Sequence, residues 1–175
     1  MAAGGDVRRT AGEFRIMVTG VWHFSFTVGD LERSIEFYCG LLGMQVSHRQ
    51  DQANPYTQKL VGYAGAKLKV AQLSIAGVSI GPSGHILELV QYMEPVYPPH
   101  PPGTAFPNSA HMAFVVADIQ SEYERLRNAG VKFRSEPVAI AAGINRGGAS
   151  VYFLDPDGIT LELLQPPPKQ AAVAQ

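Results

Sequence analysis

The sequence has only one cysteine among its 175 residues, Cys39. A single cysteine allows no intrachain disulfide and no cluster of thiolate metal ligands, so a reducing, cytoplasmic compartment is expected. The chain also lacks any apolar run near the roughly 18 to 20 residues that a membrane-spanning helix needs. The first residues lead into no apolar stretch that would form the core of a signal peptide. Neither a membrane anchor nor a secretion signal is therefore expected.

An excess of charge of one sign is lacking too. The 14 basic and 15 acidic residues give a formal net charge of −1, and the basic residues form no long run. This excludes the electrostatic footprint of a nucleic-acid-binding or membrane-surface protein. The content of 46% hydrophobic and 17% charged residues is that of an ordinary globular protein. The length suits one domain with a real core, or two small modules that share one.

The chain contains an internal repeat. Segment 23–46 aligns with segment 111–133 at an offset of 88 residues, which places His23 opposite His111. Later in the first copy the sequence LELVQ corresponds to LELLQ in the second, at an offset of 74 residues. The difference of 14 between these offsets predicts an insertion in the first copy, around residues 51–66.

Each copy has the pattern of a βαβββ unit. Asp30 and Asp118 are placed to cap a helix after the first strand, and Gly43 and Gly130 mark the ends of these helices. The DPDG turn at 155–158 predicts a hairpin between the last two strands. The expected strands lie at 20–28, 44–49, 67–76 and 85–92 in the first copy, and at 109–117, 131–134, 148–154 and 158–165 in the second.

A proline-rich stretch between the copies favours extended, semi-rigid backbone and predicts a connector. The fold class is therefore α+β, with two tandem βαβββ modules. The expected organisation is a flexible tail at 1–18, a first module at 19–93, the connector at 94–107, a second module at 108–166 and a tail at 167–175.

Four polar residues occupy matching positions in the two copies. His23 and His111 lie on the first strands, and Glu88 and Glu162 interrupt the apolar runs of the last strands. A lone histidine or glutamate in a strand is usually structural, but a carboxylate held against an apolar sheet costs several kcal/mol unless it is paired or binds a cation. Two neutral imidazoles and two carboxylates balance one divalent ion. The sequence therefore predicts a four-ligand site for Zn, Ni, Co, Mn or Fe(II).

With these features the chain resembles the vicinal oxygen chelate superfamily over roughly residues 20–166. The resemblance rests on the paired βαβββ units, the opening HFSFTVGDLERSIEFYCGLLGMQV, the close FLDPDGITLELLQP and the four His and Glu positions. This group includes glyoxalase I, methylmalonyl-CoA epimerase, extradiol dioxygenases and bleomycin- or fosfomycin-resistance proteins. The resemblance implies a curled mixed sheet around a metal that chelates two neighbouring substrate oxygens, but it does not choose a reaction.

The residue at position 88 discriminates among these relatives. Glyoxalase I has the ligand pattern His or Gln, Glu, His and Glu, whereas the epimerases typically carry Gln at the position of Glu88. The resemblance thus favours a glyoxalase-type lyase or isomerase that acts on a small α-oxo or α-hydroxy carbonyl compound, or its thiol adduct, through a metal-bound enediolate. It assigns the base to Glu162, with Glu88 as the pseudo-symmetric partner, and the two roles can be exchanged.

Three alternatives stay open: a methylmalonyl-CoA-type epimerase, an Fe(II) ring-cleaving dioxygenase and a non-catalytic drug-binding resistance protein. The dioxygenases use only three ligands, and the drug-binding members generally lack them. Candidate substrate contacts are Arg146, Asn108, Tyr56 and Tyr63, although no clear set of basic residues matches the carboxylates of glutathione. Family members commonly form homodimers, with the site either in one chain or shared by two.

Overall fold

The computed structural model describes residues 18–99 and 103–168. The tails predicted at 1–18 and 167–175 fall outside this part, apart from Val18, Pro167 and Pro168. Within the described residues, no helix is both long enough and apolar enough to cross a membrane.

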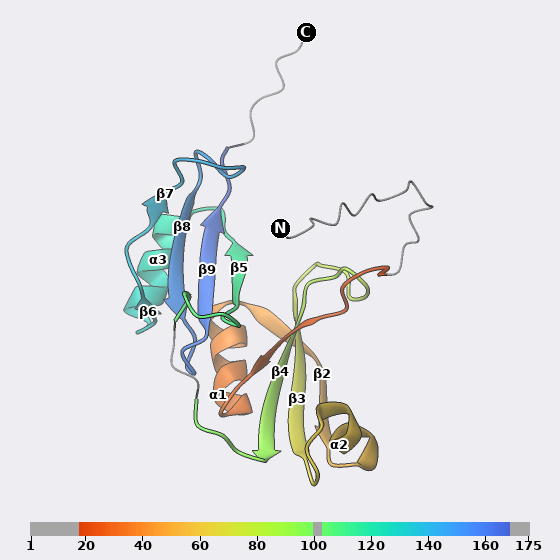
Figure 1. Ribbon diagram of the computed structural model, residues 1–175. Coiled ribbons are helices and arrows are strands. Elements are labelled where there is room, and N and C mark those ends of the chain that lie inside the picture. Colours follow the sequence, from red (N-terminus) through yellow and green to blue (C-terminus); the bar gives the residue numbers. More distant parts are fainter. Residues whose placement is uncertain (1–17, 100–102, 169–175) are drawn as a thin grey trace, which may run out of the picture.

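Two mixed sheets, one for each copy of the repeat, form the framework (Figure 1). The first has the order β1-β4-β3-β2 and the second the order β5-β9-β8-β6, with the short β7 also paired to β8. The outer strands β1 and β5 pair in parallel with β4 and β9, and the other pairs are antiparallel. The strands are β1 (Phe24–Thr27), β2 (Met44–Gln52), β3 (Lys67–Ile75), β4 (Ile86–Glu94), β5 (His111–Val115), β6 (Lys132–Phe133), β7 (Val138–Ala139), β8 (Ala149–Leu154) and β9 (Thr160–Gln165). The predicted α+β class is confirmed, and the curled sheet around a metal stays a prediction.

The predicted helix signals are confirmed in both copies. Asp30 and Asp118 are the N-caps, and each carboxylate accepts a hydrogen bond from the backbone N–H three residues later, at 3.1 and 3.0 Å. Gly43 and Gly130 follow the helices with φ of 71° and 88°, a conformation that glycine adopts without strain. The first helix is divided into α1 (Leu31–Ile35) and the π-helical η1 (Glu36–Leu41), and the second is α3 (Ile119–Asn128).

The insertion in the first copy contains a helix that the sequence analysis did not predict, α2 (Pro55–Val61). Asn54 caps it, and Pro55 occupies its first turn, where the missing N–H costs nothing. Val61 packs on Val70 and Val90, which share the face of the first sheet that carries Glu88. The insertion therefore covers part of the sheet face on which the first predicted metal ligands lie.

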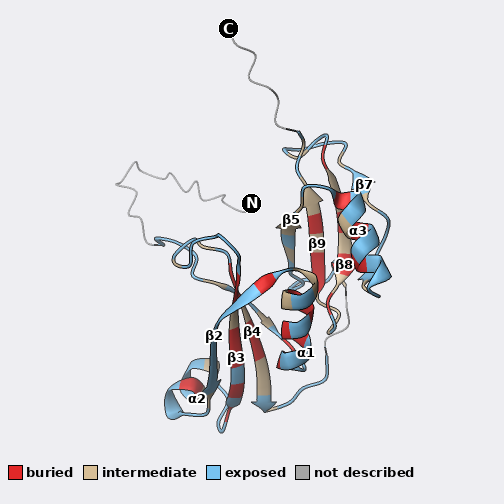
Figure 2. Cartoon of the chain, turned by 180° about the vertical axis from the view of Figure 1, so that it is seen from behind, coloured by how far each residue is buried: buried red, intermediate tan, exposed pale blue. Residues whose placement is uncertain are grey.

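The two modules share one hydrophobic core. Helix α1 lies between the two sheets in Figure 1, and buried residues occur on α1, β3, β4 and β9 in Figure 2. The core joins side chains from both sheets and from the first helix: Leu73, Leu87 and Leu89 from the first sheet, Phe153, Leu161 and Leu163 from the second, and Ile35 and Tyr38 from the helix.

Polar contacts to the DPDG turn reinforce this junction. The buried Tyr38 hydroxyl donates a hydrogen bond to a carboxylate oxygen of Asp155 at 3.1 Å. Burial raises the pKa of the Asp155 carboxyl and also that of the Tyr38 phenol. At the surface of the same turn, Arg33 forms an ion pair with Asp157 at 2.5 Å. The turn that closes the β8–β9 hairpin thus also connects the modules.

Replacing Tyr38 by Phe is expected to lower the free energy of unfolding by about 1 to 3 kcal/mol, because the buried Asp155 loses a hydrogen-bond donor. Urea denaturation followed by circular dichroism measures the change. Tyr56→Phe is the matched control, since the Tyr56 side chain is exposed. Equal stabilities of the two variants would show that the Tyr38–Asp155 contact contributes nothing.

Candidate active site

The first predicted pair of ligands meets on one face of the first sheet. Glu88 lies in the middle of β4, and the parallel register places Ser25 of β1 directly opposite it. His23, two residues before Ser25, projects to the same face. Its Nε2 lies 3.5 Å from Oε1 of Glu88, with the Glu88 side chain mostly buried.

The second pair repeats this arrangement in the second sheet. Ala113 of β5 lies opposite Glu162 of β9, so His111 and Glu162 share a face. Nε2 of His111 is 3.3 Å from Oε2 of Glu162. The ring of Tyr152, on the neighbouring β8, lies 5.2 Å from the His111 ring, measured between centroids.

Both pairs have the spacing that two ligands of one metal ion require. A divalent ion binds imidazole nitrogen and carboxylate oxygen at about 2.1 Å each, so ligands at 90 to 109° to one another are about 3.0 to 3.4 Å apart. The observed distance of 3.3 Å lies within this range, and that of 3.5 Å is just beyond it. Nδ1 of His23 is buried and lacks a hydrogen-bond partner within the described residues. The residues present therefore fit a metal.

A hydrogen bond from a neighbouring strand holds each glutamate. Nε2 of Gln72, on β3, donates to Oε2 of Glu88 at 3.2 Å. The Ser150 hydroxyl, on β8, donates to Oε1 of Glu162 at 2.5 Å. The sequence analysis did not identify either donor. Gln72 could have been found as a polar residue inside the apolar strand KVAQLSI, whereas nothing distinguishes Ser150 before the β8–β9 register is known.

The structure brings together the members of each pair, but it does not join the two pairs. Among the described residues, no three or more His, Cys, Asp and Glu side chains lie close enough to hold one metal ion. The four-ligand site stays a prediction, and so does its division between one chain and two.

A cavity of about 700 Å³, called the connector cavity here, is lined by Ser25, the register partner of Glu88, but by none of the four predicted metal ligands. Ser25 and Thr27 of β1 form one wall, and Thr160 of β9, the neighbour of His111 in the sheet register, forms another. The predicted substrate residues Asn108 and Tyr63 both line it. Asn108 has φ of 76°, a conformation that asparagine tolerates better than most residues.

The other two predicted substrate residues lie elsewhere. Tyr56 is exposed on α2, and Arg146 is exposed in the loop between β7 and β8; neither lines the connector cavity. Their roles stay predictions.

Strand β6 and its end place two cations that the sequence analysis missed. Lys132 lies opposite Leu154, and the backbone N–H of Arg134 donates to the carbonyl of Tyr152, so both side chains share the face of Glu162. Nη2 of Arg134 donates to the Thr160 hydroxyl at 3.3 Å. The sequence signal for them was the alternation of Lys132 and Arg134 with Phe133, whose side chain packs against the core.

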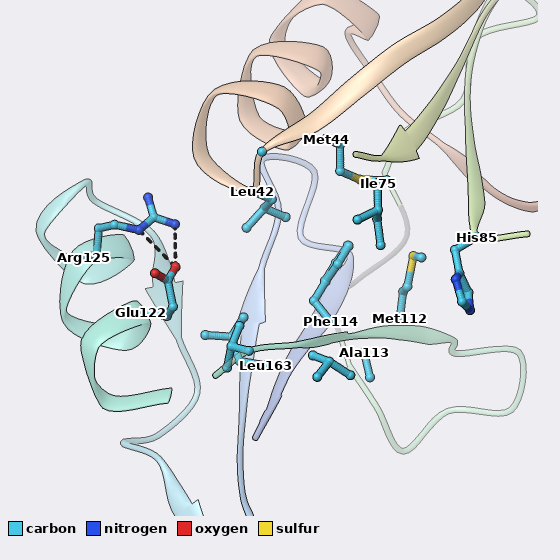
Figure 3. A pocket seen from close by; sticks show the side chains of 13 residues that line it. Leu42, Met44, Ile75, His85, Met112, Ala113, Phe114, Glu122, Arg125 and Leu163 are labelled. Carbon is cyan, nitrogen blue, oxygen red and sulfur yellow. Dashed lines mark hydrogen bonds and ion pairs between the residues drawn. The ribbon is translucent and has the colours of Figure 1, made fainter. Parts of the chain in front are cut away.

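A smaller, mostly apolar cavity of about 370 Å³ lies between the modules. Figure 3 shows Leu42 and Met44 of the first module facing Met112 and Phe114 of β5, with the Glu122–Arg125 ion pair at one side. None of the four predicted metal ligands lines this cavity. Its lining also includes His85.

Comparison with known proteins identifies related chains. Residues 20–163 match the Glyoxalase/Bleomycin resistance protein/Dioxygenase superfamily. The chain is 32% identical to a 2-epi-5-epi-valiolone epimerase from Actinomyces sp., over 84% of this chain and 79% of the relative. It is 30% identical to a probable lactoylglutathione lyase from Synechocystis sp., over 82% and 92%. A glyoxalase family protein from Bacillus cereus has the same fold, with a TM-score of 0.75 at 17% identity over 90% of this chain and all of that one.

Proposed function

Because the chain belongs to the Glyoxalase/Bleomycin resistance protein/Dioxygenase superfamily, we propose that it is a metal-dependent enzyme that moves a proton next to a carbonyl group. The proposed reaction is of the glyoxalase lyase or isomerase type, on a small α-oxo or α-hydroxy compound or its thiol adduct. The observation that carries the proposal is the repeated His–Glu pair, His23 with Glu88 and His111 with Glu162, at distances of 3.5 and 3.3 Å. One divalent ion, of Zn, Ni, Co, Mn or Fe(II), is the proposed cofactor of each site.

The proposed chemistry assigns separate tasks to the bound metal and to the chain. The metal, when bound, stabilises negative charge that develops on the substrate oxygens. Glu162 is the proposed base, because a carboxylate fixed beside the substrate can take the proton without further reorganisation. Ser150 holds one oxygen of Glu162 and leaves the other directed toward His111. Glu88, held by Gln72, has the equivalent place on the other side.

We also propose that the site is completed by a second copy of the chain, with His23 and Glu88 from one protomer and His111 and Glu162 from its partner. Two features support this arrangement. The pairs are not joined within the described part of one chain. In addition, β1 and β5 are both sheet edges, and they expose apolar side chains such as Phe24 and Val115, 57% and 70% exposed. Pairing between copies would cover these edges, which otherwise favour aggregation.

An epimerase is the second candidate. The described residues that line the connector cavity include no Lys, Arg or His, so they offer no cationic partner for the carboxylates of a glutathione adduct. The relative from Actinomyces is named an epimerase, and this name fits a substrate without such groups. Epimerases and glyoxalases share the proton abstraction, so the proposed roles of the four ligands do not change.

Two measurements on the purified protein test the proposal. Elemental analysis after chelator-free purification is expected to find about one divalent metal per chain, as four protein ligands predict. Proton NMR in deuterated water is expected to show metal-dependent exchange at the carbon next to the carbonyl for some member of a panel of 2-oxo alcohols, thiohemiacetals and acyl-CoA esters. Metal-free protein, or a panel without exchange, would contradict the proposal. Oxygen uptake with catechols would instead identify a ring-cleaving dioxygenase.

A further inference from the structure

Among the residues that the structure describes, the lining of the connector cavity carries little charge. Asp157 carries the one carboxylate among the described lining residues, and its ion pair with Arg33 at 2.5 Å neutralises it. Arg134 contacts the hydroxyl of Thr160, but it does not line the cavity. An anionic ligand group bound there would gain no cationic partner from the described lining residues.

The cavity does offer hydrogen bonds from neutral groups. The side chains of Ser25, Thr27, Asn108 and Ser109 line it, and none of them forms a hydrogen bond with another described residue. Hydroxyl and amide groups both donate and accept, so together they match a ligand that has several hydroxyl groups.

Three tyrosines supply the flat surfaces of the same cavity. The Tyr63 ring lies 6.0 Å from that of Tyr92 and 6.1 Å from that of Tyr97, measured between centroids. Aromatic rings present an apolar face together with a polar hydroxyl, a combination that fits a molecule with C–H groups on one side and hydroxyls at its edge. Tyr92 also lies on the face that Glu88 shares, so the rings extend from the proposed site along the sheet.

We propose that the connector cavity binds the part of the substrate beyond the reacting carbonyl, and that this part is an uncharged, polyhydroxylated carbon chain or ring. The inference rests on the proposed function, because the link to the proposed metal site is Ser25, which lines the cavity and is the register partner of Glu88. It also narrows the substrate class of that function, since the described lining offers no cationic partner to a substrate with two carboxylates. The tyrosines stack on its carbon face, and Ser25, Thr27 and Asn108 bind its hydroxyls.

Three hydroxamic acids with six carbons each test this inference, because the hydroxamate chelates a metal through two neighbouring oxygens and only the remainder differs. Gluconohydroxamic acid carries hydroxyls, hexanohydroxamic acid is apolar and adipic monohydroxamic acid ends in a carboxylate. Calorimetric titration of the Co²⁺-loaded protein is expected to give gluconohydroxamic acid an affinity about tenfold above either comparator, as several added hydrogen bonds imply. Equal affinities, or tighter binding of the carboxylate, would overturn the assignment of the cavity.

Two variants connect the preference to the cavity. Tyr63→Leu keeps apolar volume but removes the ring, and Asn108→Gly removes the amide while tolerating the positive φ. Each is expected to reduce the preference about threefold or more, the size of one hydrogen bond or stacking contact. Asn128→Ala, on the exposed end of α3, is expected to leave it unchanged. A preference that survives both cavity variants would overturn the inference, although metal chelation would stand. If none of the three acids binds, the proposed metal function fails, and the inference fails with it.

Discussion

Combining Glu88→Gln chains with Glu162→Gln chains is expected to restore about one quarter of wild-type activity, although each variant alone is expected to fall well below that level. If a site takes Glu88 from one protomer and Glu162 from its partner, a mixed dimer has one site with both substitutions and one intact site. Random pairing makes about half of the dimers mixed, and half of their sites are intact. Co-expression with two different affinity tags, followed by tandem purification, isolates the mixed dimer, in which about half of the wild-type metal and activity is then expected.

The matched control combines Glu88→Gln with His23→Ala. Both residues belong to the same His–Glu pair, so every site of the mixed dimer carries one substitution, and no restoration is expected. Metal content and deuterium exchange at the substrate carbon are the two readouts. If Glu88→Gln and Glu162→Gln chains restore nothing when combined, each site lies within one chain and the shared arrangement is wrong.

Glu162→Gln is expected to slow the exchange by about 10³-fold, the contribution of a positioned base, with a smaller loss of metal. The glutamine keeps the size of the side chain, and its carbonyl oxygen still accepts the hydrogen bond from Ser150. Glu88→Gln is expected to retain more of the exchange, because its oxygen remains a ligand and it is not the proposed base.

Elemental analysis and exchange rates from proton NMR, measured side by side, separate the loss of metal from the loss of the base. Glu124→Gln, at an exposed position of α3, is the control for a glutamate remote from the pairs. A larger loss of exchange in Glu88→Gln than in Glu162→Gln would move the base to Glu88. Full metal and full exchange in both variants would exclude the four-ligand account.

Local signals in the sequence were sufficient for most of the fold. Asp30 and Asp118 identified the helix starts because an N-cap is satisfied by residues three positions away. Gly43 and Gly130 identified the ends for an equally local reason. Strand parity and the repeat placed each histidine on the same face as its glutamate.

Features that depend on contacts between distant segments could not be predicted in this way. Helix α2 is only seven residues long, and its stability depends on Val61 packing against strands that follow it. The contact of Ser150 with Glu162 requires the β8–β9 register, and the connector cavity requires the positions of both modules. The separation of the two His–Glu pairs is likewise a tertiary property, about which the repeat in the sequence says nothing.

The shared core has a consequence for how the repeats behave as folding units. The sequence contains two copies of one pattern, but the side chains of α1 are buried against both sheets. Tyr38 also donates its hydrogen bond to Asp155, which lies 117 positions away in the chain. Neither half would keep its apolar surface covered alone. The duplicated chain is therefore expected to unfold in a single cooperative transition, as one thermodynamic unit in which damage to either repeat is felt by both.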